Sequence, residues 1–259
     1  MSYTAISVQG VGKTFAMLGR GPRRARQAIE EAIRAPFRPA QAVRDPYSEG
    51  FWALQDISFE IGAGEVVGLV GRNGAGKSVL LKLIARVTRP THGRVEIRGR
   101  VAPLLEVGTG FHPELTGREN IYLNGVILGM RRHEVHRRVD EIVAFADIGA
   151  FLDAPIRRYS SGMRMRLAFA VAAHLDRDIF LLDEVLAVGD QDFQAKCLTR
   201  LTDLAGEGRT VVLVSHGEQQ MERLCTRAIL LEHGRLVASG PPADVYRQYD
   251  ALRHPPAAT

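Results

Sequence analysis

Cysteine and tryptophan are scarce in this chain. Its 259 residues contain two cysteines and one tryptophan. Cys197 and Cys225 lie far apart and have no metal-type spacing. This excludes a zinc site built on paired cysteines and a dense disulfide framework. We expect two buried thiols in a reducing compartment.

Long apolar runs are also missing. No run approaches the roughly 20 residues that cross a bilayer, and the first residues lack a basic segment followed by an apolar one. We therefore expect neither a membrane-spanning helix nor a signal peptide. The charges, 34 Lys and Arg against 29 Asp and Glu, give +5. This excess fits an anionic ligand, an acidic membrane surface or nucleic acid, and does not choose among them.

The most informative segment is GRNGAGKS, residues 71–78. It matches the phosphate-binding loop pattern G-x-x-x-x-G-K-[ST] at every fixed position, between an apolar strand and an amphipathic helix. Glycines let backbone N–H groups curl around phosphate oxygens, and the helix points its positive end at the same anion. Lys77 is expected to reach the β- and γ-phosphates, and the Ser78 hydroxyl to hold Mg²⁺.

Short apolar runs alternate with helical stretches, which predicts an α/β fold with a parallel sheet. Strands are expected at residues 4–15, 52–61, 178–183 and 210–215, with a closing hairpin over 228–240. Helical patterns cover about 117–145, the segment from about Ser161 onward, and 242–253.

The run IFLLDE ends a predicted buried strand with Asp183 and Glu184. Open α/β sheets bind ligands at the carboxyl ends of their strands. Asp183 can hold Mg²⁺ there, and Glu184 can polarise an attacking water. Alone, such a run is more often a plain strand end, but the upstream phosphate loop strengthens the functional interpretation.

A third motif is YSSGM, residues 159–163. Ser160 and Ser161 stand where they can cap the following helix. Ser160, Gly162 and the amino end of that helix can also form a second phosphate site, and both interpretations can hold together. Because the chain already has one phosphate loop, a second anion site suggests ATP sandwiched between two copies.

The order of the phosphate loop, YSSGM, IFLLDE and LVSH resembles the ATP-binding-cassette (ABC) family over nearly the whole chain. YSSGM stands where that family has LSGGQ, with Ser161 and Met163 as departures. Three features resemble the subfamily that exports polysaccharides such as O-antigen, capsule or teichoic acid: SSGM, FWAL at 51–54, and LLEVGTGFHPELTGRENIYLNG at 104–125.

The resemblance implies one nucleotide-binding domain over residues 1–252 and a tail over 253–259. Its P-loop ATPase core has a parallel sheet, an antiparallel β subdomain and an α-helical subdomain at about 108–174. An insert covers 16–50. The implied nucleotide-binding residues are Gly71, Asn73, Gly74, Ala75, Gly76, Lys77, Ser78, Val79 and Phe15.

The same resemblance implies further roles. Catalysis is assigned to Lys77, Glu184 and His216, with Glu184 as general base and His216 at the γ-phosphate. The residues implied to act on the nucleotide of a second copy are Ser160, Ser161, Gly162 and Met163. Asp190 is implied as a dimer contact. The implied metal residues are Ser78, Asp183 and Glu106, the last standing near the place of the family's usual glutamine.

Three questions stay open at this point. Phe15 fits the adenine-stacking position, Phe51 or Trp52 could substitute, and a buried aromatic is the alternative for each. The arginine-rich insert is either a solvated amphipathic helix or a helix near anionic headgroups or a polymer entrance. The histidines without metal-ligand spacing are expected on loops or the surface: His92, His112, His133, His136 and His174.

Together these features imply the ATP-hydrolysing subunit of an exporter that moves a lipid-linked polysaccharide across the inner membrane. Expected cofactors are ATP and Mg²⁺. Expected partners are a second copy, a transmembrane permease and, indirectly, the polysaccharide, without nucleic acid. The expected location is peripheral, on the cytoplasmic face of the inner membrane. The alternatives are a soluble ABC-type ATPase acting on DNA or ribosomes, and an importer ATPase.

Overall fold

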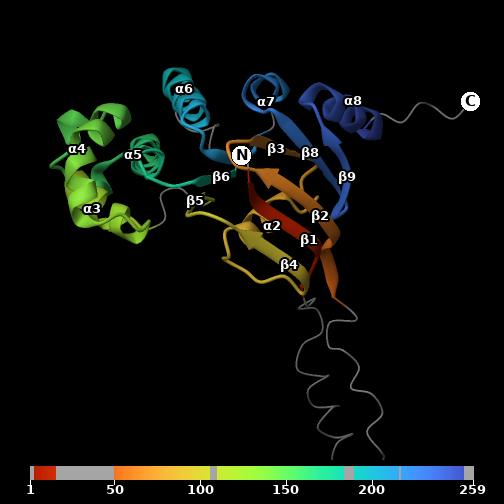
Figure 1. Cartoon of the computed structure of the whole chain (residues 1–259). Helices are drawn as coiled ribbons and strands as arrows, with labels where there is room; N and C mark the ends of the chain where they lie inside the picture. Colours follow the sequence, from red (N-terminus) through yellow and green to blue (C-terminus); the bar gives the residue numbers. More distant parts are fainter. Residues whose placement is uncertain (1–2, 16–49, 106–109, 184–189, 216, 254–259) are drawn as a thin grey trace, which may run out of the picture.

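The structure is a computed structural model that describes residues 3–15, 50–105, 110–183, 190–215 and 217–253. Nearly all of the insert, and the predicted site residues Glu106, Glu184 and His216, lie outside these ranges. Within them, Figure 1 shows a body of two sheets with a lobe of helices projecting to one side.

The larger sheet has six strands in the order β5-β6-β7-β3-β8-β9. They are β3 (Val66–Val70), β5 (Val101–Leu104), β6 (Ile179–Asp183), β7 (Thr210–Val214), β8 (Arg227–Glu232) and β9 (Arg235–Gly240). All pair in parallel except β8 with β9, which form the predicted hairpin. The carboxyl ends of β3, β6 and β7 therefore share one edge, which confirms the predicted parallel core.

The central strands β3, β6 and β7 are almost entirely apolar and buried, because both faces of the sheet are covered there. In β6, Ile179 and Leu181 join one buried cluster, while Phe180 and Leu182 join the other. Period-2 alternation thus sends successive side chains of one strand into two separate cores.

One core lies between the parallel sheet, helix α2 (Lys77–Ile84) and an antiparallel sheet. That smaller sheet has the order β2-β1-β4, with β1 (Thr4–Phe15), β2 (Phe51–Gly62) and β4 (His92–Ile97). Buried members from three layers meet there, among them Leu54 of β2, Leu80 of α2 and Leu181 of β6. The predicted antiparallel β subdomain is therefore present, and it covers the helix that follows the phosphate loop.

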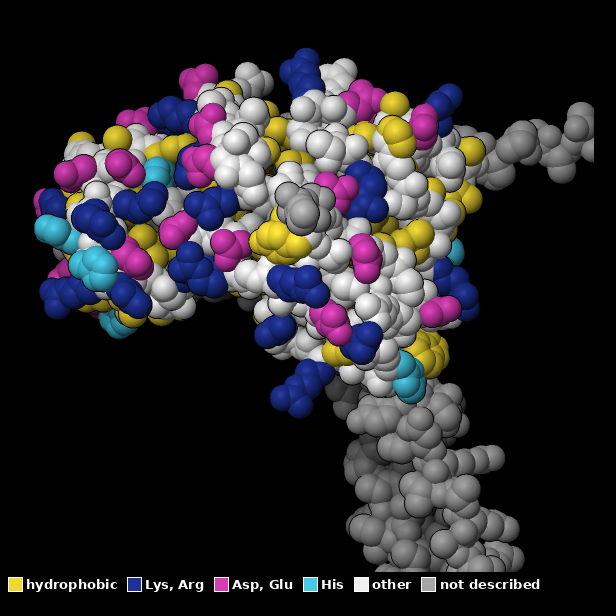
Figure 2. Space-filling model, viewed as in Figure 1, with side chains coloured by type: hydrophobic (Ala, Val, Ile, Leu, Met, Phe, Trp, Pro, Cys, Tyr) yellow, Lys and Arg dark blue, Asp and Glu magenta, His cyan; other side chains and the backbone are white. Residues whose placement is uncertain are grey.

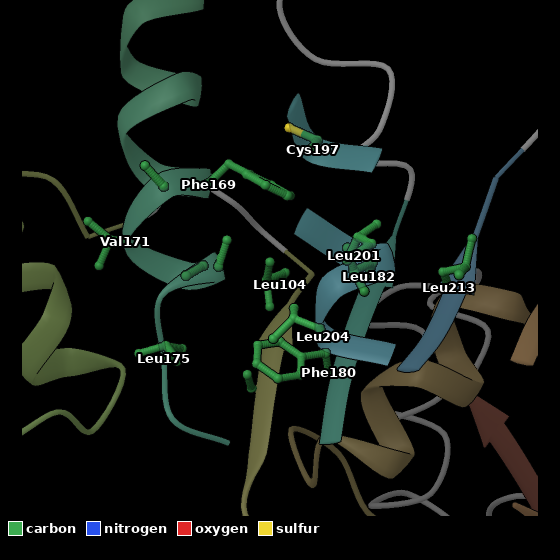
Figure 3. Packing of buried hydrophobic residues seen from close by; sticks show 14 of the residues in the cluster. Leu104, Phe169, Val171, Leu175, Phe180, Leu182, Cys197, Leu201, Leu204 and Leu213 are labelled. Carbon is green, nitrogen blue, oxygen red and sulfur yellow. The ribbon is translucent and has the colours of Figure 1, made fainter. Parts of the chain in front are cut away.

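The other face is covered by helices α5 (Ser161–Ala173), α6 (Gln191–Gly206), α7 (Glu218–Leu224) and α8 (Pro242–Arg253). Figure 3 shows Phe169 of α5 and Leu201 and Leu204 of α6 packed with Phe180 and Leu182 of β6. The buried residues of α5 run from Leu167 to Ala173, so this contact holds the second half of the helix, and its amino end, where YSSGM lies, stays more exposed.

Helices α3 (Gly117–Ile127) and α4 (Arg132–Ala146) pack with α5 to form the lobe seen in Figure 1. The helical stretch predicted over 117–145 is thus two helices. The break falls at Gly129, whose φ of 86° lies in the left-handed region that ends a helix. Figure 2 shows basic and acidic side chains interspersed over this lobe, as expected for a solvated face.

His174 lies in the turn after α5, as expected for a loop histidine, but it is buried and not at the surface. Its Nδ1 lies 2.7 Å from the carbonyl oxygen of Ala170, and its ring meets the Phe145 ring edge-on. Burial lowers the pKa of His174, so the neutral imidazole is favoured. The prediction of buried thiols is confirmed for Cys197 and Cys225.

In the part of the chain that the structure describes, no helix is long and apolar enough to cross a membrane.

Candidate functional site

The phosphate loop joins β3 to α2 at the carboxyl edge of the parallel sheet. Gly76 caps α2 with φ 105°, and its cap has no side-chain hydrogen bond. The N–H groups at the start of a helix have no carbonyl partner within the helix itself, and such a start suits an anion. A Cβ on Gly71 would lie 2.3 Å from the Leu231 carbonyl oxygen, so the loop passes too close to β8 for any side chain there.

Lys77 is buried at the base of this loop. Its Nζ donates to the carbonyl oxygens of Gly71, at 2.7 Å, and Arg72, at 3.1 Å. These contacts satisfy a desolvated ammonium and hold it beneath the loop backbone. The positive charge is thus placed where phosphates would lie.

A pocket of about 440 Å³ opens beside the loop. Its residues come from the loop, from α2 and from the β1/β2 pair: Phe15, Phe51, Ala53, Asn73, Gly74, Gly76, Lys77, Ser78 and Val79. Every predicted nucleotide-binding residue lines this pocket except Gly71 and Ala75, which are buried. The pocket joins an apolar wall to a phosphate-binding floor, which is the combination that a nucleotide needs.

Two of the three candidate aromatics face this pocket. Phe15 and Phe51 are partners in the β1/β2 register and are 45% and 54% exposed. The ammonium of Lys13 lies 5.1 Å from the Phe15 ring centroid. Trp52 instead stacks on His92, with centroids 5.7 Å apart, and is not among the pocket residues. None of the three is fully buried, so both phenylalanines remain available to stack on a base.

The metal candidates that the structure describes lie at the same sheet edge. Asp183 ends β6, beside Val214 of β7, and β7 in turn neighbours β3. Two strand spacings separate β6 from β3, or about 10 Å. The Ser78 hydroxyl is exposed at the start of α2. Hydroxyl and carboxylate oxygens suit Mg²⁺, which prefers few protein ligands together with substrate phosphates.

The described residues contain no cluster of three or more His, Cys, Asp or Glu side chains that could enclose a metal ion. Glu106 and Glu184 lie outside the described ranges, so their relation to Asp183 stays a prediction.

The YSSGM segment forms the start of α5. Ser160 is the N-cap residue, and its Oγ accepts from the Met163 N–H at 3.1 Å, which confirms the predicted cap. A Cβ on Gly162 would meet only Ser160 Oγ, at 3.8 Å, so nothing in the described chain requires glycine there. Met163 is partly buried against the core, whereas Ser161 is exposed.

Asp190 is the N-cap of α6. Its Oδ1 accepts from the Phe193 N–H at 2.9 Å. Its Oδ2 lies 3.6 Å from Arg166 on α5. The resemblance implies that this residue contacts a second copy, but its carboxylate is also engaged within its own subunit. Sequence reasoning missed Arg166, because nothing in the pattern places it beside Asp190.

A second pocket, of about 480 Å³, was not predicted. It lies between the phosphate loop and α8, and its walls include Arg72, Ser215, Tyr249 and Arg253. Helix α8 was predicted as an element, but its position beside the loop depends on the β8/β9 hairpin that precedes it. This pocket borders the described end of β7, where Ser215 precedes His216.

Comparison with known proteins agrees with this geometry. The family model described as "ABC transporter" matches residues 54–187. An O-antigen export system ATP-binding protein, RfbB, of Klebsiella pneumoniae is 48% identical over 213 residues, 82% of this chain and 87% of the relative. A teichoic acids export ATP-binding protein, TagH, of Bacillus anthracis is 42% identical over 80% of this chain but only 38% of the relative.

The fold matches solved ATP-binding cassettes. A dimeric post-hydrolysis structure of the cassette MJ0796 bound to ADP and Pi is 23% identical, with a TM-score of 0.69 over 92% of this chain and 98% of that one. The predicted α/β fold and the predicted family are confirmed. The chain therefore belongs to the ABC transporter family of ATP-hydrolysing cassettes.

Proposed function

We propose that this chain is the ATP-hydrolysing subunit of an exporter that moves a lipid-linked polysaccharide, such as O-antigen, capsule or a related glycan, across the inner membrane. The observation that carries the proposal is the phosphate loop and pocket in a chain whose relatives are named for O-antigen and teichoic acid export. The names of these relatives favour an exporter ATPase over an importer ATPase and over an ATPase acting on DNA or ribosomes.

Nucleotide binding is proposed to use the pocket beside the loop. The backbone N–H groups of 71–78 and the amino end of α2 bind phosphate oxygens, and Lys77 places its charge against the β- and γ-phosphates. Phe15 and Phe51 offer ring faces to the base. Phosphates and base are thereby held at opposite ends of one pocket.

Hydrolysis is proposed to use groups at the neighbouring strand ends. Ser78 and Asp183 would hold Mg²⁺, with Glu106 as a further candidate. When bound, the ion neutralises phosphate charge. Glu184, next to Asp183, accepts a proton from the attacking water. His216, which follows Ser215 at the end of β7, contacts the γ-phosphate.

A second copy is proposed to complete each site. The open space at Gly162 and the exposed start of α5 support this, because a phosphate can approach there without meeting a side chain. Two copies related by a two-fold axis would each place Ser160, Ser161, Gly162 and Met163 against the partner's nucleotide. Closure of this dimer is the step that would move a transmembrane permease at the cytoplasmic face of the inner membrane.

The test is Glu184→Gln, which keeps the shape and removes the base. Turnover of the purified protein is expected to fall by roughly 10²–10⁴ while ATP still binds. In cells that depend on this exporter, the same variant is expected to leave lipid-linked glycan on the cytoplasmic side. Normal turnover would remove Glu184 from its role, and normal surface glycan would refute export as the function.

A further inference from the structure

Arg166 lies between two carboxylates that come from different elements. It stands on α5, six residues after the Ser160 cap. One of its terminal nitrogens is 3.6 Å from Asp147 Oδ2 and 3.6 Å from Asp190 Oδ2. Asp147 ends α4 and Asp190 begins α6. A single guanidinium therefore connects three helices.

One side of this guanidinium lies against an aromatic ring. Its carbon lies 5.2 Å from the ring centroid of Phe193, which is fully buried. The side chain is only 19% exposed, and within the described chain its Nε is buried without a hydrogen-bond partner. A desolvated charge with an unsatisfied donor costs free energy, so packing alone does not account for an arginine here.

Both ion-pair distances exceed the normal range of an N–H···O hydrogen bond. One nitrogen is thus shared between two acceptors and fully bonded to neither. A small displacement of α5 can shorten one contact and lengthen the other. The arrangement suits a group that transmits movement better than a group that locks one conformation.

Asp190 is held from two sides. Its Oδ1 caps α6 through the Phe193 N–H, and its Oδ2 faces Arg166. Movement of the guanidinium therefore acts directly on the first turn of α6. Asp190 stands six residues after Glu184 in the chain.

We propose that Arg166 is a positioning residue that couples the start of α5 to Asp190, so that contact of Ser160 and Gly162 with a partner's nucleotide is communicated to α6. This inference rests on the ATP-closed dimer of the proposed function. Arg166 is not among the residues that line the proposed nucleotide pocket. It acts through Asp190, while Asp147 is the competing acceptor on the helical lobe.

A double-mutant cycle can test this coupling with variants that each remove one charge. Asp190→Asn keeps an N-cap of equal quality and removes the negative charge. Arg166→Gln removes the positive charge, and Arg166→Lys restores it without the planar group that stacks on Phe193. Arg164→Gln is the matched control, because Arg164 is an exposed arginine on the same helix with no ion pair in the described residues.

The first measurement is ATP-driven dimerisation, monitored by sedimentation. All variants carry Glu184→Gln, and the protein with that change alone is the reference. Arg166→Gln and Asp190→Asn are each expected to weaken dimerisation about tenfold, and the double variant no further, because both remove one coupling. Arg166→Lys is expected to restore part of the loss, and Arg164→Gln to behave like the reference. Binding of a fluorescent ATP analogue to the monomer, and the thermal midpoint, are expected to stay near the reference in every variant.

The second measurement is turnover in the otherwise natural chain, where Arg166→Gln is expected to lower kcat about tenfold with KM nearly unchanged. Additive losses, an equal loss in Arg164→Gln, or a loss of monomer ATP binding would each overturn the coupling role. A reference protein that stays monomeric with ATP would refute the proposed dimer and this inference with it. If the reference dimerises but the double variant loses as much as the two single variants together, only the role of Arg166 is refuted and the proposed dimer stands.

Discussion

The Nζ of Lys77 lies 2.7 Å from the carbonyl oxygen of Gly71, so a buried ammonium links the first residue of α2 to the start of the phosphate loop. This contact comes from the spacing of the motif. Six residues separate the two groups, and the loop curls back far enough for them to meet.

Lys77→Met keeps the length of the side chain and removes its charge. We expect ATP affinity to fall by about 10–100-fold, since a hydrogen bond to a charged group contributes about 1.5–3 kcal/mol. Titration with a fluorescent ATP analogue measures this. Lys82→Met, at the other end of α2, is the control and should bind ATP as the unmodified chain does. An equal loss in both variants would point to damage of the helix.

Gly76 and Gly162 should respond to alanine in opposite ways. A Cβ on Gly76 would lie 2.6 Å from a Leu54 side-chain carbon and 2.7 Å from the Ala53 carbonyl oxygen, at φ 105°. Gly76→Ala is expected to destabilise the fold by about 1–3 kcal/mol or more.

Gly162 has open space and sits in the first turn of α5. Gly162→Ala is expected to leave the monomer as stable or up to about 1 kcal/mol more stable, yet to impair ATP-driven dimerisation and turnover. Gly162→Asp should block both, because it adds a like charge facing phosphate. Urea unfolding and sedimentation separate the two effects. Full turnover in Gly162→Asp would argue against the shared site.

The two phenylalanines of the pocket should affect nucleotide affinity. Phe15→Ala or Phe51→Ala is expected to raise the KM for ATP about tenfold with kcat little changed, since stacking on a base contributes about 1–3 kcal/mol. Trp52→Leu is the matched control because Trp52 stacks on His92 outside the pocket. A KM change only in the Trp52 variant would reverse the assignment.

The buried thiols should make stability sensitive to alkaline pH. Burial raises the pKa of both Cys197 and Cys225 to about 12, above the value of about 8.5 for an exposed thiol. Their contribution is therefore complete below about pH 8.5 and declines as the pH rises towards about 12, because the unfolded chain loses these protons first. Urea midpoints measured from pH 7.5 to pH 10.5 should fall, and fall less in a Cys197→Ala/Cys225→Ala variant. If the urea midpoints of the two proteins fell equally with pH, the prediction would be contradicted.

Nearly all of the insert lies outside the described residues, and its role stays a prediction. Replacing Arg20, Arg23, Arg24 and Arg26 by Ala is expected to leave ATP turnover of the purified protein nearly unchanged. It should weaken binding to anionic vesicles in a salt-sensitive manner, since such attraction is screened within about 10 Å at moderate salt. Unchanged vesicle binding and unchanged export would favour the solvated-helix interpretation.

Local features of the sequence were sufficient for the elements and for the phosphate loop. Apolar runs such as that of β6 predict buried parallel strands because both faces of the sheet are covered. Glycine, lysine and serine at fixed spacing predict the loop because its geometry is set within eight residues. Ser160 as a cap followed from its place before an apolar helix, and the structure confirms it.

Long-range contacts decided the rest. The sequence alone was enough for the order of the motifs, the resemblance based on it, the strands, the loop and the cap. That Phe15 and Phe51 face the pocket while Trp52 turns to His92 depends on the β1/β2 register. The burial of His174 and the place of Arg166 between Asp147 and Asp190 depend on how α4, α5 and α6 pack. Such contacts join residues with no shared period or spacing, so only the tertiary structure brings them together.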